Sequence, residues 1–591
     1  MTASQTIDFR SHLINDGDLK DEDNPMTFAH SIRSLIILFI ALTATPAAAQ
    51  DTLLLKNARI FDVVNGRLSD EAQAVLISGN RILGITTDPS ARADRTIDLQ
   101  GRVLLPGLID LHSHLLLHPY NETVWDDQVL KESLELRTIR ATVAANRTLA
   151  AGFTCVRDLG TQGAGFADVA LRDAIAQGII PGPRIFTATK ALVTTGGYGP
   201  MGFDPRWEIP IAAQTADGIA ECRKATREQI AAGADWIKIY ADYRRRSGAP
   251  PTPTFSQNEI NAIVDEARSA NIPVAAHAAT DEAIQRCIAA GVQTIEHGYD
   301  ASLETLQMMR EKGIVLCPNL TAAESISIYQ GWDPQNDPDP PRIRKAKQLI
   351  KNALACGVTI ACGSNAGVYA HGENSRELEL MFAYGMSVEE LLRSATVTAA
   401  NVLGQNDLGQ VNPKFIADLI VVDENPVNNL FTLQEPAMVI KNGQVAFNNI
   451  NPDGVSQTTN PSSAQVVEET IELGSNKELG KLIRQLDMAS PNIETEPGTT
   501  APNARPKAEP ENDASDRFQF QLNADGSYSL KNAPITRGDL ARYIARQIGN
   551  GITAAEVTIP NSINQQRVKE TQEWLNRLGI KSVQFTGNTP N

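Results

Sequence analysis

The sequence predicts an α/β protein built around a (β/α)8 barrel with parallel strands. Two observations support this fold class. Short apolar segments with β-strand patterns alternate with helical patterns along the middle of the chain. Strands joined through helices pair in parallel, and eight of them close into a barrel. The candidate strands lie at 107–111, 153–157, 184–187, 236–240, 274–277, 294–297, 314–317 and 358–362.

The second observation is the position of the histidines. Active sites of such barrels lie at the carboxyl ends of the strands. His112 and His114 end the first candidate strand, where side chains two residues apart point the same way. His277 ends the fifth strand and His297 the sixth. Histidine-rich sites suit zinc and tolerate other divalent ions, so these four residues are candidate metal ligands. Lys238 lies within the fourth strand, where a buried ammonium is costly unless it is paired or loses its charge.

The composition excludes several other classes of protein. Hydrophobic residues make up 42% of the 591 residues and charged residues 21%, which is ordinary for a globular protein and excludes a wholly disordered, collagen-like or polytopic membrane protein. A formal net charge of −16 argues against binding of nucleic acid by general charge. The six cysteines include no Cys-x-x-Cys pair and do not indicate a dense disulfide framework.

The first 50 residues are typical of processed segments. Residues 26–50 contain a basic start, a short apolar run and an Ala-x-Ala end, which predict a secretory signal peptide rather than a membrane span of about 20 residues. Residues 1–25 carry six acidic and two basic residues, so they are predicted to be an upstream extension, with Met26 as the start. An uncleaved anchor is the alternative. We expect a periplasmic or secreted protein whose mature chain has no stable membrane span.

The C-terminal part predicts a linker and a small α+β module. Residues 451–515 are rich in Pro, Asn, Ser, Thr and Glu around a short helical pattern at 466–488, which indicates a disordered linker. Residues 516–591 contain strand patterns at 518–522, 528–530, 556–559 and 581–585 and helical patterns at 538–548 and 565–578. With the motifs DGSYSL, PIT and LGIKSV, this module resembles the periplasmic domain of the ExbD/TolR biopolymer-transport family, which implies an envelope partner. An unrelated small α+β domain is the alternative.

The order His-x-His, Lys, His, His resembles the amidohydrolase superfamily, and within it the imidazolonepropionase-like and Xaa-Pro/Xaa-Arg dipeptidase branch. The motifs are GRVLLPGLIDLHSH at 101–114, ADLIVVD at 417–423 and VIKNGQV at 439–445. The resemblance implies that the flanks 51–104 and 405–450 form one small β-sandwich beside a barrel at 105–404.

The same resemblance implies a site with two divalent metal ions. It places His112 and His114 on the buried ion and His277 and His297 on the other. Lys238, carboxylated on its side-chain nitrogen by carbon dioxide, would bridge the two ions. The implied reaction is cleavage of a carbon–nitrogen amide bond by a metal-activated hydroxide.

One position departs from this family pattern. The family has an Asp at the end of the eighth strand, which ligates the buried metal and carries a proton to the leaving amine, whereas this chain has Asn365. An amide can ligate weakly but has no basic form near neutral pH, so it cannot carry that proton. Glu296 and Asp300 flank His297 as candidate replacements. Asn365 and His297 are the predicted catalytic residues. The alternative functions are an impaired metal-binding pseudoenzyme, an envelope binding protein, or an adaptor that works through its C-terminal module.

Substrate contacts are expected from the loops that follow the strands. Tyr240, Tyr243 and Arg244 follow the fourth strand, and Arg244 or its neighbours at 245–246 could bind a substrate carboxylate through a bidentate fork. A solvated loop is the alternative for these arginines. His371, after the eighth strand, is a further candidate for substrate contact. Dipeptides, N-acyl amino acids and cyclic amides all fit as substrates. A homo-oligomer is possible, and the sequence does not decide the oligomeric state.

Overall fold

The computed structural model describes residues 51–450, apart from Pro89, Pro205 and Gln335, and parts of the segment 517–586. The chain divides into two compact units, Met1–Asn460 and Pro461–Asn591. The predicted upstream extension, signal peptide and linker lie outside the described residues. Among those described, no helix is both long and apolar enough to cross a membrane.

Seven parallel strands and one irregular segment form the barrel. Strands β7, β8 and β9 make one part of it and β10, β12, β15, β16 and β17 the other. A hydrogen bond from the Trp236 N–H to the Thr187 carbonyl, 3.0 Å long, connects the two parts between β9 and β12. The third barrel strand is interrupted, so that β9 and the short β10 both belong to it. The bounds are β7 Leu108–Ser113, β8 Phe153–Asp158, β9 Arg184–Thr187, β10 Leu192–Val193, β12 Ile237–Tyr240, β15 Val274–Ala278, β16 Thr294–His297 and β17 Val315–Cys317.

The eighth segment, 358–362, closes the barrel without forming a regular strand, so that prediction was wrong in detail. Ile360 makes a single parallel bridge to Leu316. The Ala361 N–H donates to the Leu316 carbonyl, and the Leu111 N–H donates to the Cys362 carbonyl, each at 2.9 Å. The segment thus bonds to both neighbours. Its ladder breaks because the Cys362 N–H donates to Ser394 instead.

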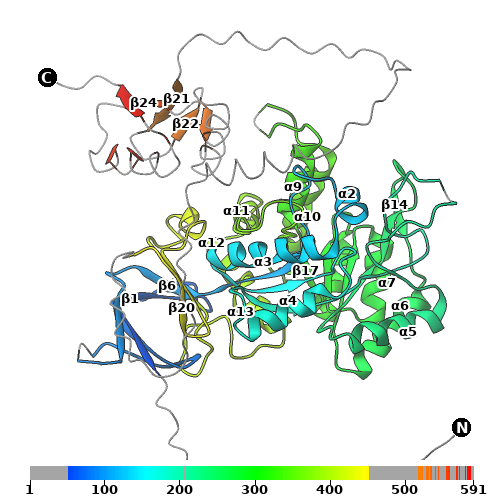
Figure 1. Cartoon of the computed structure of the whole chain (residues 1–591), viewed down its shortest axis with the longest axis horizontal. Helices are drawn as coiled ribbons and strands as arrows, with labels where there is room; N and C mark the ends of the chain where they lie inside the picture. The colour runs from blue at the N-terminus through cyan, green and yellow to red at the C-terminus, as the bar shows by residue number, and fades with distance from the viewer. Residues whose placement is uncertain are drawn as a thin grey trace, which may run out of the picture. The chain divides into compact units, whose positions relative to one another are not determined.

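Helices surround the strands (Figure 1). Several begin at the polar residues that cap helices: Ser256 and Ser387 each form a capping box with a Glu three residues later. The apolar faces of the helices pack on the strands in one large core. The bounds are α2 Trp125–Leu130, α3 Leu134–Ala150, α4 Ala167–Ala176, α5 Gly218–Ala231, α6 Gln257–Ser269, α7 Asp281–Ala290, α8 Leu303–Lys312, α9 Leu320–Tyr329, α10 Pro341–Cys356, α11 Arg376–Ala383, α12 Val388–Ser394 and α13 Val397–Val402.

The segments on either side of the barrel share one nine-stranded sheet system with the order β20-β19-β18-β6-β1-β3-β4, to which β2 and β5 add through β1. Antiparallel pairing of Ile420 with Leu105 joins the two flanks, and Figure 1 shows the blue and yellow strands side by side. An apolar core that includes Leu55, Ile77 and Val421 lies between the halves. The bounds are β1 Thr52–Asp62, β2 Arg67–Leu68, β3 Gln73–Ser78, β4 Arg81–Thr86, β5 Arg95–Asp98, β6 Val103–Pro106, β18 Leu419–Val422, β19 Met438–Lys441 and β20 Gln444–Asn448.

The C-terminal unit contains a five-stranded sheet with the order β23-β22-β21-β24-β25. The sequence predicted four of these strands but not β23. Phe520, Val557 and Leu575 are buried in its core. Residues 540, 544, 568–569, 571–572 and 575 are helical, within the two predicted helices. The bounds are β21 Arg517–Leu522, β22 Tyr528–Leu530, β23 Ala533–Ile535, β24 Ala554–Thr558 and β25 Ser582–Thr586.

Candidate active site

The four strand-end histidines lie together at one end of the barrel. The ring centroids of His112 and His114 are 5.2 Å apart, and those of His112 and His297 are 5.6 Å apart. The rings of His277 and His297 are 4.5 Å apart. Parallel pairing of β7, β15 and β16 with their neighbours places these residues at the same edge, although 185 positions separate the first from the last.

Burial makes these imidazoles neutral. Burial first, and then the nearby positive charge of Lys238, lowers the pKa of His114 and His277 to about 3. The pKa values of His112 and His297 also fall well below the ordinary value, first because of burial and then because of neighbouring cationic groups. A neutral imidazole keeps a lone pair on one ring nitrogen, which is the form that binds metal ions.

Hydrogen bonds at Nδ1 fix the orientation of His112 and His114. The Nδ1 of His112 donates to Glu296 Oε2 at 2.7 Å, and the Nδ1 of His114 donates to the Gly160 carbonyl at 2.9 Å. With Nδ1 protonated, each Nε2 carries the free lone pair. A carboxylate or carbonyl behind a ligating histidine is the usual second partner in metal sites, where it sets the tautomer.

Glu296 and Asp300, the candidate replacements for the missing carboxylate, are both engaged elsewhere. Besides His112, fully buried Glu296 accepts hydrogen bonds from Arg157 at 2.9 Å and from Thr294 at 2.6 Å. Asp300 forms an ion pair with Lys345, with Nζ and Oδ1 2.6 Å apart. Neither carboxylate is therefore free to carry a proton in this arrangement.

Several buried polar atoms around the histidines have no hydrogen-bond partner. They include Nζ of Lys238, a residue only 1% exposed, and Oδ1 of Asn365. Burial lowers the pKa of Lys238 to about 8, against the opposing effect of Glu296. Unpaired buried polar atoms are costly, so these two atoms are candidates for contact with a bound group.

The strand ends that carry His297 and Asn365 have unusual backbone. His297, Asn319 and Asn365 have φ values of +74°, +54° and +64°. Asn319 supports this geometry, because its Oδ1 accepts from the His297 N–H at 3.1 Å and its Nδ2 donates to the Gly363 carbonyl at 2.8 Å. Left-handed backbone at non-glycine residues is strained, and such residues often cluster at functional sites. Sequence reasoning did not identify Asn319.

An aromatic wall covers one side of the site. Tyr240 stacks between Tyr198, at 4.1 Å, and His277, at 4.8 Å. Buried Gln162 connects three rings of this wall: its Oε1 accepts from the Tyr198 hydroxyl at 2.5 Å and from Trp125 Nε1 at 3.2 Å, and its Nε2 donates to the Tyr240 hydroxyl at 3.2 Å. Tyr240 was predicted. The other three were not, because they come from segments after different strands and share no local motif.

The remaining predicted substrate residues lie at different distances from the histidines. The ring of Tyr243 is 6.0 Å from that of His277. Arg244 is exposed, with its guanidinium carbon 5.6 Å from the centre of the Tyr243 ring. His371 is buried, and its Nε2 donates to the Leu117 carbonyl at 3.0 Å. This bond holds His371 to the loop after β7, and its contact with substrate stays a prediction.

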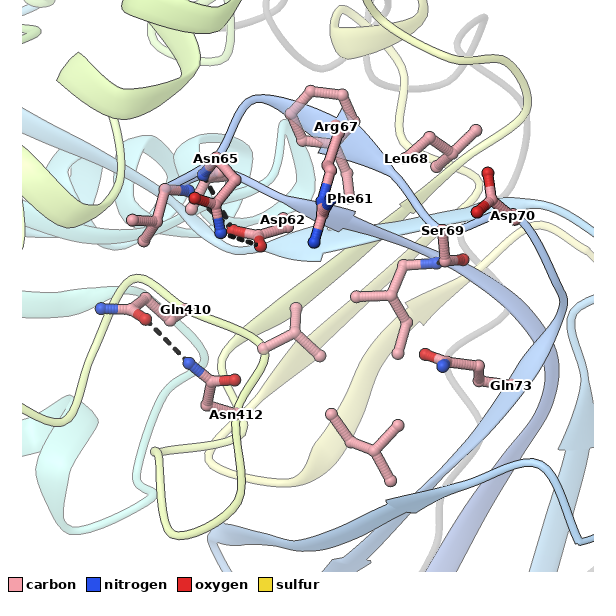
Figure 2. Close-up of a pocket in the computed structure, with 15 residues that line it drawn as sticks. Phe61, Asp62, Asn65, Arg67, Leu68, Ser69, Asp70, Gln73, Gln410 and Asn412 are labelled. Carbon is pink, nitrogen blue, oxygen red and sulfur yellow. Dashed lines mark hydrogen bonds between the residues drawn. The ribbon is translucent and has the colours of Figure 1, made fainter.

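A surface hollow of about 740 Å³ lies elsewhere, in the flanking sheet system. Figure 2 shows Asp62, Arg67, Asp70 and Gln73 around it, together with the hydrogen-bonded pair of Gln410 and Asn412. None of the predicted site residues lines this hollow. The candidate site is therefore defined by its side chains rather than by the hollow.

Residues 103–446 match the amidohydrolase family. Ochratoxinase from Aspergillus niger is 30% identical over 366 residues, which cover 57% of this chain and 73% of that relative. Imidazolonepropionase from Klebsiella pneumoniae is 24% identical over 420 residues, with 65% and 95% coverage. The crystal structure of a prolidase complexed with N-methylphosphonate-L-proline is 31% identical, with a TM-score of 0.60 and coverage of 67% of this chain and 99% of that one.

The chain belongs to the amidohydrolase family. It is an enzyme of the class that hydrolyses carbon–nitrogen bonds, and members of the family are generally metal-dependent. The family and barrel fold predicted from the motifs and the strand pattern are confirmed. The matched region ends before the C-terminal unit, whose resemblance to the ExbD/TolR domain stays a prediction.

Proposed function

We propose that this chain is a metal-dependent hydrolase that cleaves the amide bond of a dipeptide, an N-acyl amino acid or a cyclic amide. One observation carries the proposal: four neutral imidazoles lie beside two buried polar atoms that have no partner, Lys238 Nζ and Asn365 Oδ1. Within the described ranges, no group of three or more His, Cys, Asp or Glu side chains could hold a metal by itself. The donor set combines the four imidazoles with Lys238 and Asn365. It fits metal ions once Lys238 becomes an anion.

Lys238 has the environment that carboxylation requires. An amine with a pKa near 8 is partly uncharged around neutral pH, and its lone pair can attack the carbon of carbon dioxide. The new N–C bond forms with loss of one proton from nitrogen, which leaves a carbamate with two donor oxygens. In this proposal His112, His114 and Asn365 would hold one ion and His277 and His297 the other, and the carbamate would supply an oxygen donor to each.

Zinc is the expected ion because neutral imidazoles and carboxylates are its common ligands. Two divalent ions, when bound, polarise the scissile carbonyl and lower the pKa of water so that hydroxide forms at neutral pH. The chain itself orients His112 through Glu296 and positions the aromatic wall against the substrate. Asn365 cannot deliver a proton to the leaving nitrogen, so we expect slow turnover rather than none. The hydrolases among its relatives do not favour the pseudoenzyme alternative.

The experiment is metal analysis of the full-length protein together with hydrolysis assays on dipeptides and N-acyl amino acids. We expect about two divalent ions per chain, as in two-metal hydrolases, and amide hydrolysis that a chelator abolishes. His277→Ala should lower both metal content and activity. His118→Ala is the matched control, because His118 lies outside the cluster with its Nε2 2.8 Å from Glu132. Bound metal without turnover would support the pseudoenzyme, and absence of both would support a binding protein or an adaptor.

We also propose a periplasmic or secreted location, which the pattern at 26–50 supports, and an envelope partner for 516–591, which the resemblance of that module supports. Fractionation of cells that express the full chain tests the location. Recovery of the protein in the cytoplasm, with residues 26–50 still attached, would contradict it.

A further inference from the structure

Arg342 is a cation near the site that has no partner among the described residues. It is the second residue of α10 and is partly buried. One of its terminal guanidinium nitrogens is enclosed and makes no hydrogen bond, and no carboxylate in the described part of the chain forms an ion pair with it. Buried nitrogens of this kind are normally hydrogen-bonded, and the preferred partner of a guanidinium is a carboxylate.

The first turn of α10 lies against the loop that follows β16. Lys345 pairs with Asp300 in that loop at 2.6 Å. Arg342 lies three positions before Lys345, so both side chains are on the same face of the helix. The neighbour of Asp300 in the loop is Tyr299, whose ring centroid is 5.7 Å from that of His297. The helix therefore presents Arg342 toward the His297 side of the site.

The charge of Arg342 reaches two tyrosines at the edge of the site. Burial raises the pKa of Tyr243 and of Tyr299, and the positive charge of Arg342 opposes the rise in both. Tyr243 lies beside His277, as Tyr299 lies beside His297. The positive charge of Arg342 is therefore felt by the tyrosines next to His277 and His297.

The other arginines near the site are worse candidates for binding an anion. Arg244 is exposed and is stacked over Tyr243, and Arg245 is exposed and donates to the Pro253 carbonyl at 3.0 Å. Exposed ion pairs contribute little because water competes with them. An ion pair with the partly buried Arg342 is weakened less by competing water.

We propose that Arg342 binds a free carboxylate of the substrate on the Tyr243 and Tyr299 side of the site. This inference rests on the proposed hydrolase function and narrows it. The substrate is then a dipeptide or an N-acyl amino acid with a free carboxylate, and a neutral cyclic amide is excluded. The planar guanidinium offers parallel N–H donors that match both carboxylate oxygens.

The test measures binding of a carboxylate that cannot be hydrolysed. The probe is 3-benzoylpropionate, in which a methylene replaces the amide nitrogen of hippurate, and its uncharged amide is the matched ligand. Calorimetry on the full-length protein should show tighter binding of the carboxylate. Arg342→Met should weaken that binding roughly 10- to 100-fold, as expected for a hydrogen bond to a charged group, and leave binding of the amide unchanged. Arg342→Lys should lose less affinity for the carboxylate, because the positive charge remains.

Arg344→Met is the matched control on the same helix, because Arg344 is exposed and bonds to the Asp339 carbonyl; it should change neither affinity. Equal binding of the carboxylate and the amide by the wild type would overturn the proposal, as would a loss caused by Arg244→Met and not by Arg342→Met. Hydrolysis of hippurate is measured separately. A wild type that hydrolyses no amide but shows the Arg342 effect would refute the proposed function and leave the carboxylate site standing.

Discussion

Replacement of Asn365 by Asp should increase the rate of amide hydrolysis. Asn365 has left-handed backbone with φ +64°, a conformation that Asp also tolerates, so the change should not disturb the strand end. Its Oδ1 is buried without a partner, and the new carboxylate would occupy the same place. The substitution therefore adds a proton carrier without removing an existing contact of that oxygen.

The size of the effect follows from the engagement of the two carboxylates that flank His297. Glu296 is bonded to His112, Arg157 and Thr294, and Asp300 is paired with Lys345. General acid–base catalysis contributes roughly 10²–10⁴-fold, so Asn365→Asp should raise kcat by at least about 100-fold. KM should change less, because the proton is transferred in the transition state.

The assay is steady-state hydrolysis of an N-acyl amino acid, with rates normalised to the metal content of each preparation. Asn271→Asp is the control, because Asn271 also has left-handed backbone, with φ +57°, but is exposed on the surface. Its rate should equal that of the wild type. If the wild type is already active and Asn365→Asp gives no gain, the proton takes another route and the reasoning is refuted.

Three further substitutions test the support of the site. Lys238→Met should abolish binding of the ion assigned to His277 and His297, yet raise the free energy of unfolding of the metal-free protein by about 1–3 kcal/mol, because an unpaired buried amine is removed; a destabilised metal-free variant would contradict this. Glu296→Gln should weaken metal affinity roughly 10- to 100-fold and lower the melting temperature, because Arg157 becomes an unpaired buried charge; unchanged affinity would show that Glu296 does not support His112. Gly367→Ala should reduce activity more than Gly404→Ala, because its Cβ would lie 2.5 Å from the His114 carbonyl oxygen, whereas that of Gly404 meets nothing within 4 Å. Equal losses in the two glycine variants would show that backbone strain alone is responsible.

Local patterns were sufficient to predict the residues that stand at strand ends. His112, His114, His277 and His297 follow short apolar segments, and parallel pairing in a barrel brings such positions to one edge. The same alternation predicted seven barrel strands. It wrongly predicted a regular strand at 358–362, because apolar composition does not reveal that the Cys362 N–H bonds outside the barrel ladder.

Contacts across the barrel could not be predicted from the sequence. Glu296 was considered as a proton carrier because it precedes His297, whereas its partners Arg157 and His112 come from strands distant in sequence. Gln162 and Arg342 lie in a loop and at a helix start that carry no recognisable motif. Their roles depend on which side chains remain unpartnered after folding, and this is a property of the packed structure alone.

We propose above all that the strand-end cluster holds the metal ions that drive amide hydrolysis. The most direct test of this proposal is the number of divalent ions bound per chain, measured by elemental analysis of the wild type and of a variant with alanine at all four of these histidines. We expect about two ions in the wild type, the number in two-metal hydrolases, and essentially none in the variant, together with loss of hydrolysis. Retention of the ions by the variant, or hydrolysis by a fully metal-free wild type, would contradict it.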